Sequence, residues 1–318
     1  MWTTYETDRR GPKAWALLSS MGRGDGQMAG VLSLIGGAVI IASFALAWLI
    51  ATLGLAGLSD RTNLEQVYEP PALTPLKWLL DQRDVRASTL FGAPPQAEGF
   101  HVLGTDGAGR DILSLLVLGT RTYLVPGLLA VSIALGLGIL LGTIHGHYGG
   151  YAAKAVSWFV KTVHSVPKLL LLLVIGAVTD FDVKWLMFGL GFAGAPRVTE
   201  MVAARIASLR RADFIEAARE AGLREWVIVA KHVLWYNCRH LLVIQASFFM
   251  AEAILMETTL SYLNSGAQGL SWGRMVQHGS NDLFQGIYWT SAAPAAAVVT
   301  TILGFYLLGD GLNRIQQS

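Results

Sequence analysis

Long apolar stretches alternate with polar connections along this chain of 318 residues. The ranges 26–59, 122–153 and 283–309 contain no Lys, Arg, Asp or Glu. Each is longer than the roughly 20 apolar residues that a helix needs to cross the hydrocarbon core of a bilayer. The pattern therefore predicts three membrane-spanning helices.

Three further stretches, 156–178, 185–207 and 241–263, are apolar with a few polar interruptions. Polar side chains inside a membrane usually face a protein interior or a wet pathway. We therefore expect an all-α integral membrane protein with six transmembrane helices. The interruptions are Lys161, His164 and Lys168 in the first stretch, Pro196, Arg197 and Glu200 in the second, and Glu252 and Glu257 in the third.

Lysine and arginine gather in the segments that this topology assigns to the inner side, which orients the chain with both termini in the cytoplasm. The long connection after the first helix is exempt from that rule because of its length. The expected layout is a cytoplasmic tail over 1–29, a first transmembrane helix over 30–53, an extracytoplasmic connection with an interfacial helix over 54–122, a five-helix core over 123–310 with a cytoplasmic coupling loop at 205–239, and a cytoplasmic tail over 311–318.

Composition supports a membrane protein and offers little for catalysis. The chain is 53% hydrophobic and 14% charged, which is too apolar for an ordinary soluble domain. Its one cysteine, Cys238, excludes an internal disulfide. The glycines at 104–109 lack the Gly-Lys-Ser/Thr step of a phosphate loop, and His145 and His147 have no thiol or carboxylate neighbour to complete a metal site. We expect no catalytic residue, no bound metal or cofactor, and no nucleic-acid partner.

The connection at 205–239 contains a short helical signal between two apolar stretches. Ala217 and Ala218 are strong helix formers with little bulk, so a partner can approach their backbone closely. Gly222 can adopt the left-handed conformation that ends a helix. The alternative interpretation is a basic inner loop without a partner. The candidate coupling residues are Asp213, Phe214, Glu216, Ala217, Ala218 and Gly222.

This segment resembles the EAA loop of ABC importer permeases, in which a short helix docks on the ATPase subunit. Four further motifs occur in the order typical of the dipeptide/oligopeptide permease family, and the resemblance extends over about 95–314. It is closest to the second of the two paired permeases. The motifs are 101–114, which includes Gly104, Thr105, Asp106, Gly109, Arg110 and Asp111, then 257–263, 271–275 and 309–312.

The resemblance implies a type I (MetI-like) importer permease in the bacterial plasma (inner) membrane. It implies a non-catalytic subunit whose partners are a second homologous permease, two cytoplasmic ATPase subunits that hold ATP and Mg²⁺, an extracytoplasmic substrate-binding protein and the lipid bilayer. The binding protein would contact Trp272 and the 104–111 segment. The chain departs from the family pattern at Trp235, which replaces a proline, at Lys161, which replaces an acid, and at 264–266.

Lys161, His164 and Lys168 are spaced i, i+3 and i+7, which places them on one face of a continuous helix. They could form a cationic stripe on the translocation pathway. Alternatively, Lys161 reaches the inner surface and Lys168 pairs with an acid on another helix. Glu252 is the better candidate for the pathway or for that pairing, and Glu257 is expected to be structural.

Other functions fit part of the pattern. A proton-driven secondary carrier could use Glu252, Glu257 and His164, and its uptake would depend on a proton gradient without an ATPase. A permease of the same family could carry nickel or another solute. A non-transporting membrane scaffold is a third alternative, which loss of uptake on deletion would exclude.

Overall fold

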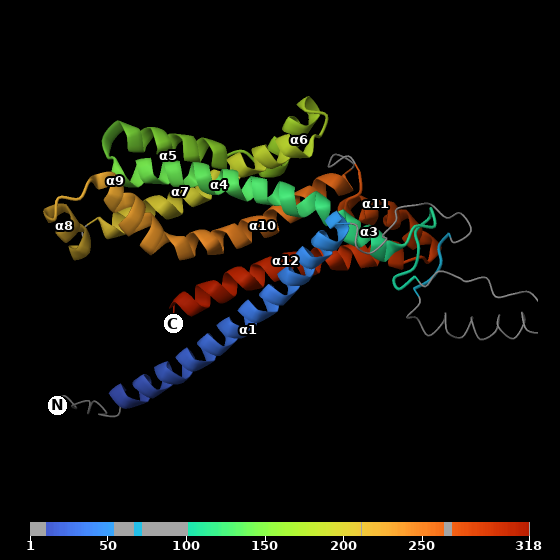
Figure 1. Ribbon diagram of the computed structural model, residues 1–318, viewed down its shortest axis with the longest axis horizontal. Helices are drawn as coiled ribbons and strands as arrows, with labels where there is room; N and C mark the ends of the chain where they lie inside the picture. Colours follow the sequence, from blue (N-terminus) through green and yellow to red (C-terminus); the bar gives the residue numbers. More distant parts are fainter. Residues whose placement is uncertain (1–10, 54–66, 72–100, 211, 264–268, 318) are drawn as a thin grey trace, which may run out of the picture.

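A computed structural model of the chain describes residues 11–53, 67–71, 101–210, 212–263 and 269–317. In these ranges every regular element is a helix (Figure 1), as expected for an all-α membrane protein. The altered turn at 264–266 lies outside the described residues. The helices are α1 (Gly11–Leu53), α3 (Ile112–Gly119), α4 (Arg121–His147), α5 (Gly150–His164), α6 (Lys168–Val178), α7 (Val183–Leu209), α8 (Asp213–Glu220), α9 (Glu225–Val227), the π-helical η1 (Ile228–Cys238), α10 (Arg239–Tyr262), α11 (Trp272–Asp282), the 3₁₀ turn η2 (Leu283–Gln285) and α12 (Trp289–Gln317).

Four helical stretches are long and apolar enough to cross a membrane, and the bent pair α5–α6 makes a possible fifth. The expected sixth span forms α7, a helix of 27 residues. It does not meet the same apolar criterion because Arg197 and Glu200 lower its hydropathy. By length and composition the count is therefore four or five rather than six. The four stretches are Gln27–Leu53, Ile112–His147, Glu225–Tyr262 and Trp289–Gln316.

The expectation of one continuous helix over 156–178 is wrong. The chain bends by 82° between α5 and α6. Pro167 has no N–H to donate, and its ring disfavours the helical conformation at Val166. Helix α1 begins at Gly11, within the expected tail, whereas the stretch of it that is apolar enough to cross a membrane is Gln27–Leu53.

Helices α4 and α7 pack closely against each other at a row of glycines on α4. Gly138, Gly142 and Gly146 on α4 are four residues apart, so they line one side of the helix. Cβ atoms built on them would lie 2.4, 2.7 and 2.8 Å from the Cβ atoms of the residues that face them on α7. Such spacing of small residues lets two membrane helices approach closely. The facing residues are Val198, Val202 and Ile206.

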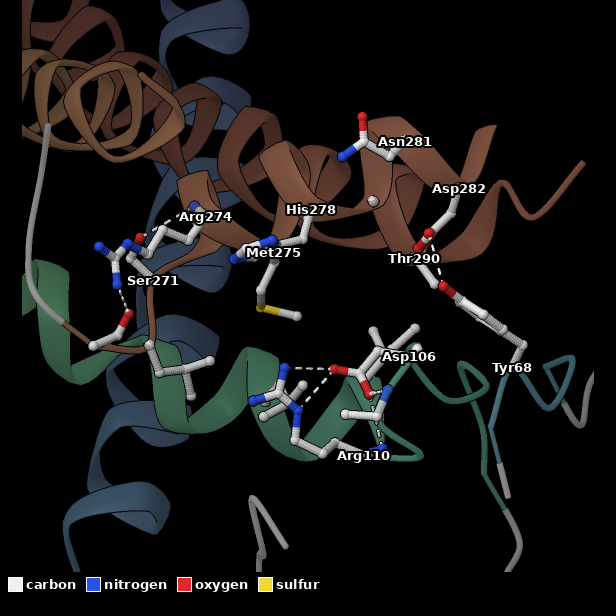
Figure 2. A pocket seen from close by; sticks show the side chains of 17 residues that line it. Tyr68, Asp106, Arg110, Ser271, Arg274, Met275, His278, Asn281, Asp282 and Thr290 are labelled. Carbon is white, nitrogen blue, oxygen red and sulfur yellow. Dashed lines mark hydrogen bonds and ion pairs between the residues drawn. The ribbon is translucent and has the colours of Figure 1, made fainter. Parts of the chain in front are cut away.

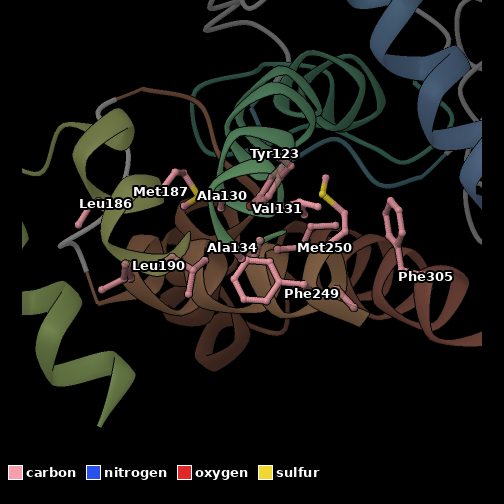
Figure 3. Close-up of a cluster of buried hydrophobic side chains, with 14 of the residues drawn as sticks. Tyr123, Ala130, Val131, Ala134, Leu186, Met187, Leu190, Phe249, Met250 and Phe305 are labelled. Atoms are coloured by element: carbon pink, nitrogen blue, oxygen red, sulfur yellow. The ribbon is translucent and has the colours of Figure 1, made fainter. Parts of the chain in front are cut away.

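Helix α10 adds the third side of this core (Figure 3). The ring of Phe249 fills the space beside Gly194 of α7, and Met250 fills the space beside Gly127 of α4. Both side chains are almost completely buried. The same cluster includes Tyr123 of α4, so α4, α7 and α10 form one packed unit.

Helices α1 and α12 lie side by side along the edge of this unit (Figure 1). Glycines again permit the contact, because a Cβ on Gly37 would lie 2.5 Å from the backbone nitrogen of Leu308. The helices α8 and α9 lie at one end of the molecule, and α3 and α11 lie towards the other (Figure 1). The candidate sites lie at these two ends.

Candidate functional site

Helix α8 is attached to the bundle by one apolar face. Ile215 and Ala218 are buried in a cluster with residues of α7 and η1, including Ile206 and Ile228. Asp213 and Glu216 lie in its first turn, where the positive end of the helix dipole favours negative charge. The short helix therefore has a fixed inner face and a polar outer face.

The structure divides the predicted coupling residues between these two faces. Glu216 and Ala217 are exposed, as are Asp213 and Phe214 at the start of the helix. Ala218 is buried against the bundle. It therefore fixes the position of α8, and a docking partner would contact the other side.

Gly222 ends α8 as its residue type predicts. Its φ is +76°, and a Cβ there would meet no atom within 4 Å. The N–H of Gly222 donates to the carbonyl of Arg219 at 2.9 Å, and the N–H of Leu223 donates to that of Ala218 at 3.1 Å. This pair of hydrogen bonds is a Schellman motif, which satisfies the last carbonyls of a helix.

Polar contacts join α8 to the end of α4 through Glu225 of α9. Arg219 Nε donates to Glu225 Oε1 at 2.7 Å, and this hydrogen bond raises the pKa of the guanidinium. Glu225 Oε2 lies 3.9 Å from Nε2 of His147, the last residue of α4. Helix α8 is thus linked to α4 by these polar contacts and to α7 by its buried apolar face.

The segment after α8 combines exposed aromatic side chains with an unbroken helix. Trp226 is 67% exposed and Leu223 is 41% exposed. From Glu225 the chain continues helically to Tyr262, with wide π-helical turns at η1. Trp235, at the position where the family has proline, is exposed within these turns.

The cationic stripe of the sequence does not exist as one face. Lys161 and His164 belong to α5, whereas Lys168 begins α6 beyond the bend. Lys168 instead forms an ion pair with Glu252 of α10. His164 Nδ1 lies 3.9 Å from Oε1 of Glu200 on α7. The alternative in which Lys168 pairs with an acid on another helix is thus what the structure contains.

Glu257 lies five residues after Glu252 on α10, and its side chain is buried, with 3% exposure. Ser261 Oγ donates to its Oε1 at 2.6 Å. The Tyr123 hydroxyl nearby accepts a hydrogen bond from the N–H of Gly273 at 3.2 Å. These contacts join α10, α4 and the start of α11, which is a structural arrangement.

At the opposite end, the 101–111 segment folds into a compact turn. Asp106 Oδ1 accepts from the N–H groups of Ala108 and Arg110, both at 2.9 Å. Its Oδ2 accepts from Arg110 Nε at 2.8 Å. Gly104 and Gly109 have φ of +81° and +67°, which glycine adopts without strain.

Other residues of this motif anchor neighbouring elements. Asp111 caps α3 by accepting from the N–H and hydroxyl of Ser114 at 2.8 and 2.7 Å. Thr105 is fully buried, and its carbonyl accepts from Trp289 Nε1 at 3.2 Å. The motif therefore ties α3 to the start of α12.

Trp272 is not available as a contact for a binding protein, contrary to our expectation. It is 3% exposed, and its Nε1 donates to the carbonyl of Leu116 at 2.8 Å. Its ring packs on those of Tyr123 and Phe44. An amphipathic indole at a helix start is as typical of buried packing as of an exposed contact.

Sequence reasoning missed a cavity of about 610 Å³ between the 106–115 segment and α11 (Figure 2). Its wall includes Arg110, Arg274, His278 and Asp282. Tyr68, whose hydroxyl donates to Asp282 Oδ1 at 2.9 Å, closes one end, and this hydrogen bond raises the pKa of the phenol. Only the tertiary fold brings these residues together.

The two histidines at the end of α4 point to different partners. His145 Nδ1 lies 3.0 Å from the carbonyl oxygen of Ala153, whereas His147 faces Glu225. Over the described ranges, no group of three His, Cys, Asp or Glu side chains could hold a metal ion.

Residues 134–318 match the family of binding-protein-dependent transport system inner membrane components. The chain belongs to this family. Curated relatives of this transport family cover most of the chain. The probable D,D-dipeptide transport system permease protein DdpC of Escherichia coli is 33% identical over 70% of this chain and 74% of its own. The dipeptide transport system permease protein DppC of Alkalihalophilus pseudofirmus is 33% identical over 69% and 71%.

A third relative, the oligopeptide transport system permease protein OppC of Haemophilus influenzae, is 28% identical over 70% of this chain and 72% of its own. The resemblance to dipeptide and oligopeptide ABC permeases is therefore confirmed. These relatives are permease components, so this member of the inner-membrane transport family is a permease subunit and not an enzyme.

Proposed function

We propose that this chain is one transmembrane half of an ATP-driven importer of peptides. The observation that carries the proposal is α8, whose inner face is held by Ile215 and Ala218 while Glu216 and Ala217 remain exposed. The names of the relatives supply the peptide as substrate.

In this proposal α8 docks on a cytoplasmic ATPase, which holds ATP and Mg²⁺. Phe214 and Trp226 are large exposed apolar side chains, and burial of such side chains stabilises a protein interface. Closure of two ATPase subunits would push α8. The contacts of Arg219 and Glu225 with the end of α4 would pass this movement to the packed unit of α4, α7 and α10 as a rigid-body rotation.

The same proposal places the α8 end and both termini in the cytoplasm, and the α11 end outside. A second homologous permease would complete the pathway, and an extracytoplasmic binding protein would deliver substrate. The Lys168–Glu252 ion pair would lie on the pathway wall.

The test is purification of the intact chain in mild detergent with mass spectrometry of the proteins that accompany it. The wild type should recover an ATPase and a second permease. Glu216→Lys should lose the ATPase and keep the second permease, because it reverses a charge on the exposed face of α8. Asp310→Lys, a reversal of charge near the end of α12, is the matched control and should recover both. Recovery of the chain alone in every case would refute the proposal.

A further inference from the structure

The cavity at the α11 end contains two opposite charges, Arg274 and Asp282, that form no ion pair with other residues in the described part of the chain. Arg274 Nε is buried and has no hydrogen-bond partner, and its Nη1 donates only weakly to the carbonyl of Gly269 at 3.5 Å. Arg274 interacts through space with the buried Glu257, but within the described ranges it forms no ion pair. Asp282 is bound by the neutral hydroxyl of Tyr68. By contrast, Arg110 is neutralised by Asp106.

The positions of these charges on α11 oppose the usual preference of a helix. Arg274 lies in the first turn and Asp282 is the last residue. The helix dipole places partial positive charge at the first turn and partial negative charge at the last. Each side chain therefore adds to the dipole instead of offsetting it. Natural proteins depart from such helix-dipole preferences mainly at functional or strained sites.

The cavity thus has a positive end and a negative end, and the two residues are attached about 12 Å apart along α11, because they are eight positions apart in the helix. Figure 2 shows Arg274 and Asp282 at opposite ends of the row, with Met275 and His278 between them. The volume of about 610 Å³ lies within the range of about 300–1,000 Å³ typical of ligand sites.

We propose that this cavity binds a short zwitterionic peptide, with its carboxylate on Arg274 and its ammonium group on Asp282. An extended chain spans at most about 3.3–3.6 Å per residue, so a separation of about 12 Å fits three or four residues. The separation of the two charges is argued from the geometry of α11 alone. The choice of a peptide as the ligand rests on the proposed function.

A guanidinium binds a carboxylate in a bidentate manner, which suits Arg274 as the carboxylate end. Met275, Ile112 and Leu115 supply apolar wall between the two ends. These contacts place little demand on side-chain identity. The site would therefore select for length and for free termini.

The test is calorimetric titration of the full-length chain in lipid nanodiscs with alanine peptides of one to six residues. Affinity should be highest at three or four residues. Free alanine and phosphoethanolamine, whose charges are too close together, should not bind measurably. Saturable binding that is equal for all lengths, or no binding of tetra-alanine, would overturn the proposal.

Paired changes in ligand and protein assign each end. Amidation of the peptide C-terminus and Arg274→Gln should each weaken tetra-alanine binding at least tenfold, and amidation should cost nothing further in Arg274→Gln. N-acetylation and Asp282→Asn should behave as the second pair. Asp180→Asn, in the turn between α6 and α7, and Lys184→Gln, at the start of α7, change exposed residues; they are the matched controls and should bind as the wild type does. Losses that simply add within each pair would contradict the assignment.

This titration needs no ATPase. A failed titration would leave the ATPase recovery by α8 unaffected, and a failed recovery would leave the titration unaffected. The two proposals can therefore be refuted separately.

Discussion

Replacement of Gly138 by alanine tests the packing of α4 on α7. The new Cβ would lie 2.4 Å from the Cβ of Val198, whereas carbon atoms rest at about 3.5–4.0 Å from each other. The carbonyl oxygen of Ala195, at 3.1 Å, leaves no room on the other side. The two helices would have to separate by about 1 Å, and overpacking of this kind costs about 1–3 kcal/mol.

The single cysteine provides the assay. Cys238 is fully buried and belongs to the same cluster as Val198, so a thiol-reactive dye labels it only when this part of the bundle opens. Gly138→Ala should lower the midpoint of thermal labelling by several degrees, since 1 kcal/mol corresponds to about 2–4 °C in a domain of 150–250 residues.

Gly136 provides the control, because it lies on the same helix and a Cβ there would meet nothing within 4 Å. Gly136→Ala should leave the midpoint unchanged or raise it slightly, in line with the helix propensity of alanine. Val198→Gly removes the clashing Cβ and Cγ1, so the double variant should lose less than the two single variants together. Equal midpoints for the Gly136 and Gly138 variants would refute the packing argument.

Three further outcomes follow from the sites. Gly222→Ala should destabilise the end of α8 by about 1–2 kcal/mol because of its positive φ and lower ATPase recovery about fivefold or more, whereas Gly222→Asn should be milder. Glu252→Gln should reduce peptide uptake more than Glu257→Gln, since it leaves Lys168 unpaired; equal or reversed effects would contradict this ranking. Trp272→Phe should lower the labelling midpoint through the lost hydrogen bond to α3, by about 1 kcal/mol; lost uptake at an unchanged midpoint would instead favour an exposed role.

Much of the fold could be predicted from the sequence because long stretches without charged residues indicate membrane-spanning helices. The helical class and the permease family were read from such stretches and from short ordered motifs. The bend at Pro167 is not apparent from the hydropathy, because apolar residues lie on both sides of the polar interruption at 161–168. The hydropathy of a segment says nothing about the direction of its axis. Similarly, Arg197 and Glu200 lower the mean hydropathy of α7, although many residues of this helix are buried by packing on α4.

The candidate sites divide in the same way. Gly222 was predictable because glycine at a helix end has a local conformational reason. The partner of Lys168 required knowledge of which helices touch, and sequence reasoning could only name Glu252 as one candidate. The cavity beside α11 was not predictable, since it joins segments near residues 68, 106 and 274 that are distant in the chain. Ala218 showed no sign that it faces inward until the packing of α8 was known.

The order of α4 and α7 in the chain has a consequence for synthesis. About 60 residues separate the end of α4 from the end of α7, and ribosomes add about 5–20 residues per second. For about 3–12 s, α4 with its row of glycines has therefore been synthesised, whereas the complete α7 helix that packs against this row has not. During this interval its groove can accept any other helix that lies nearby. Substitutions that widen the groove would then show their effect first as lower yield of inserted protein, before any change in the finished transporter.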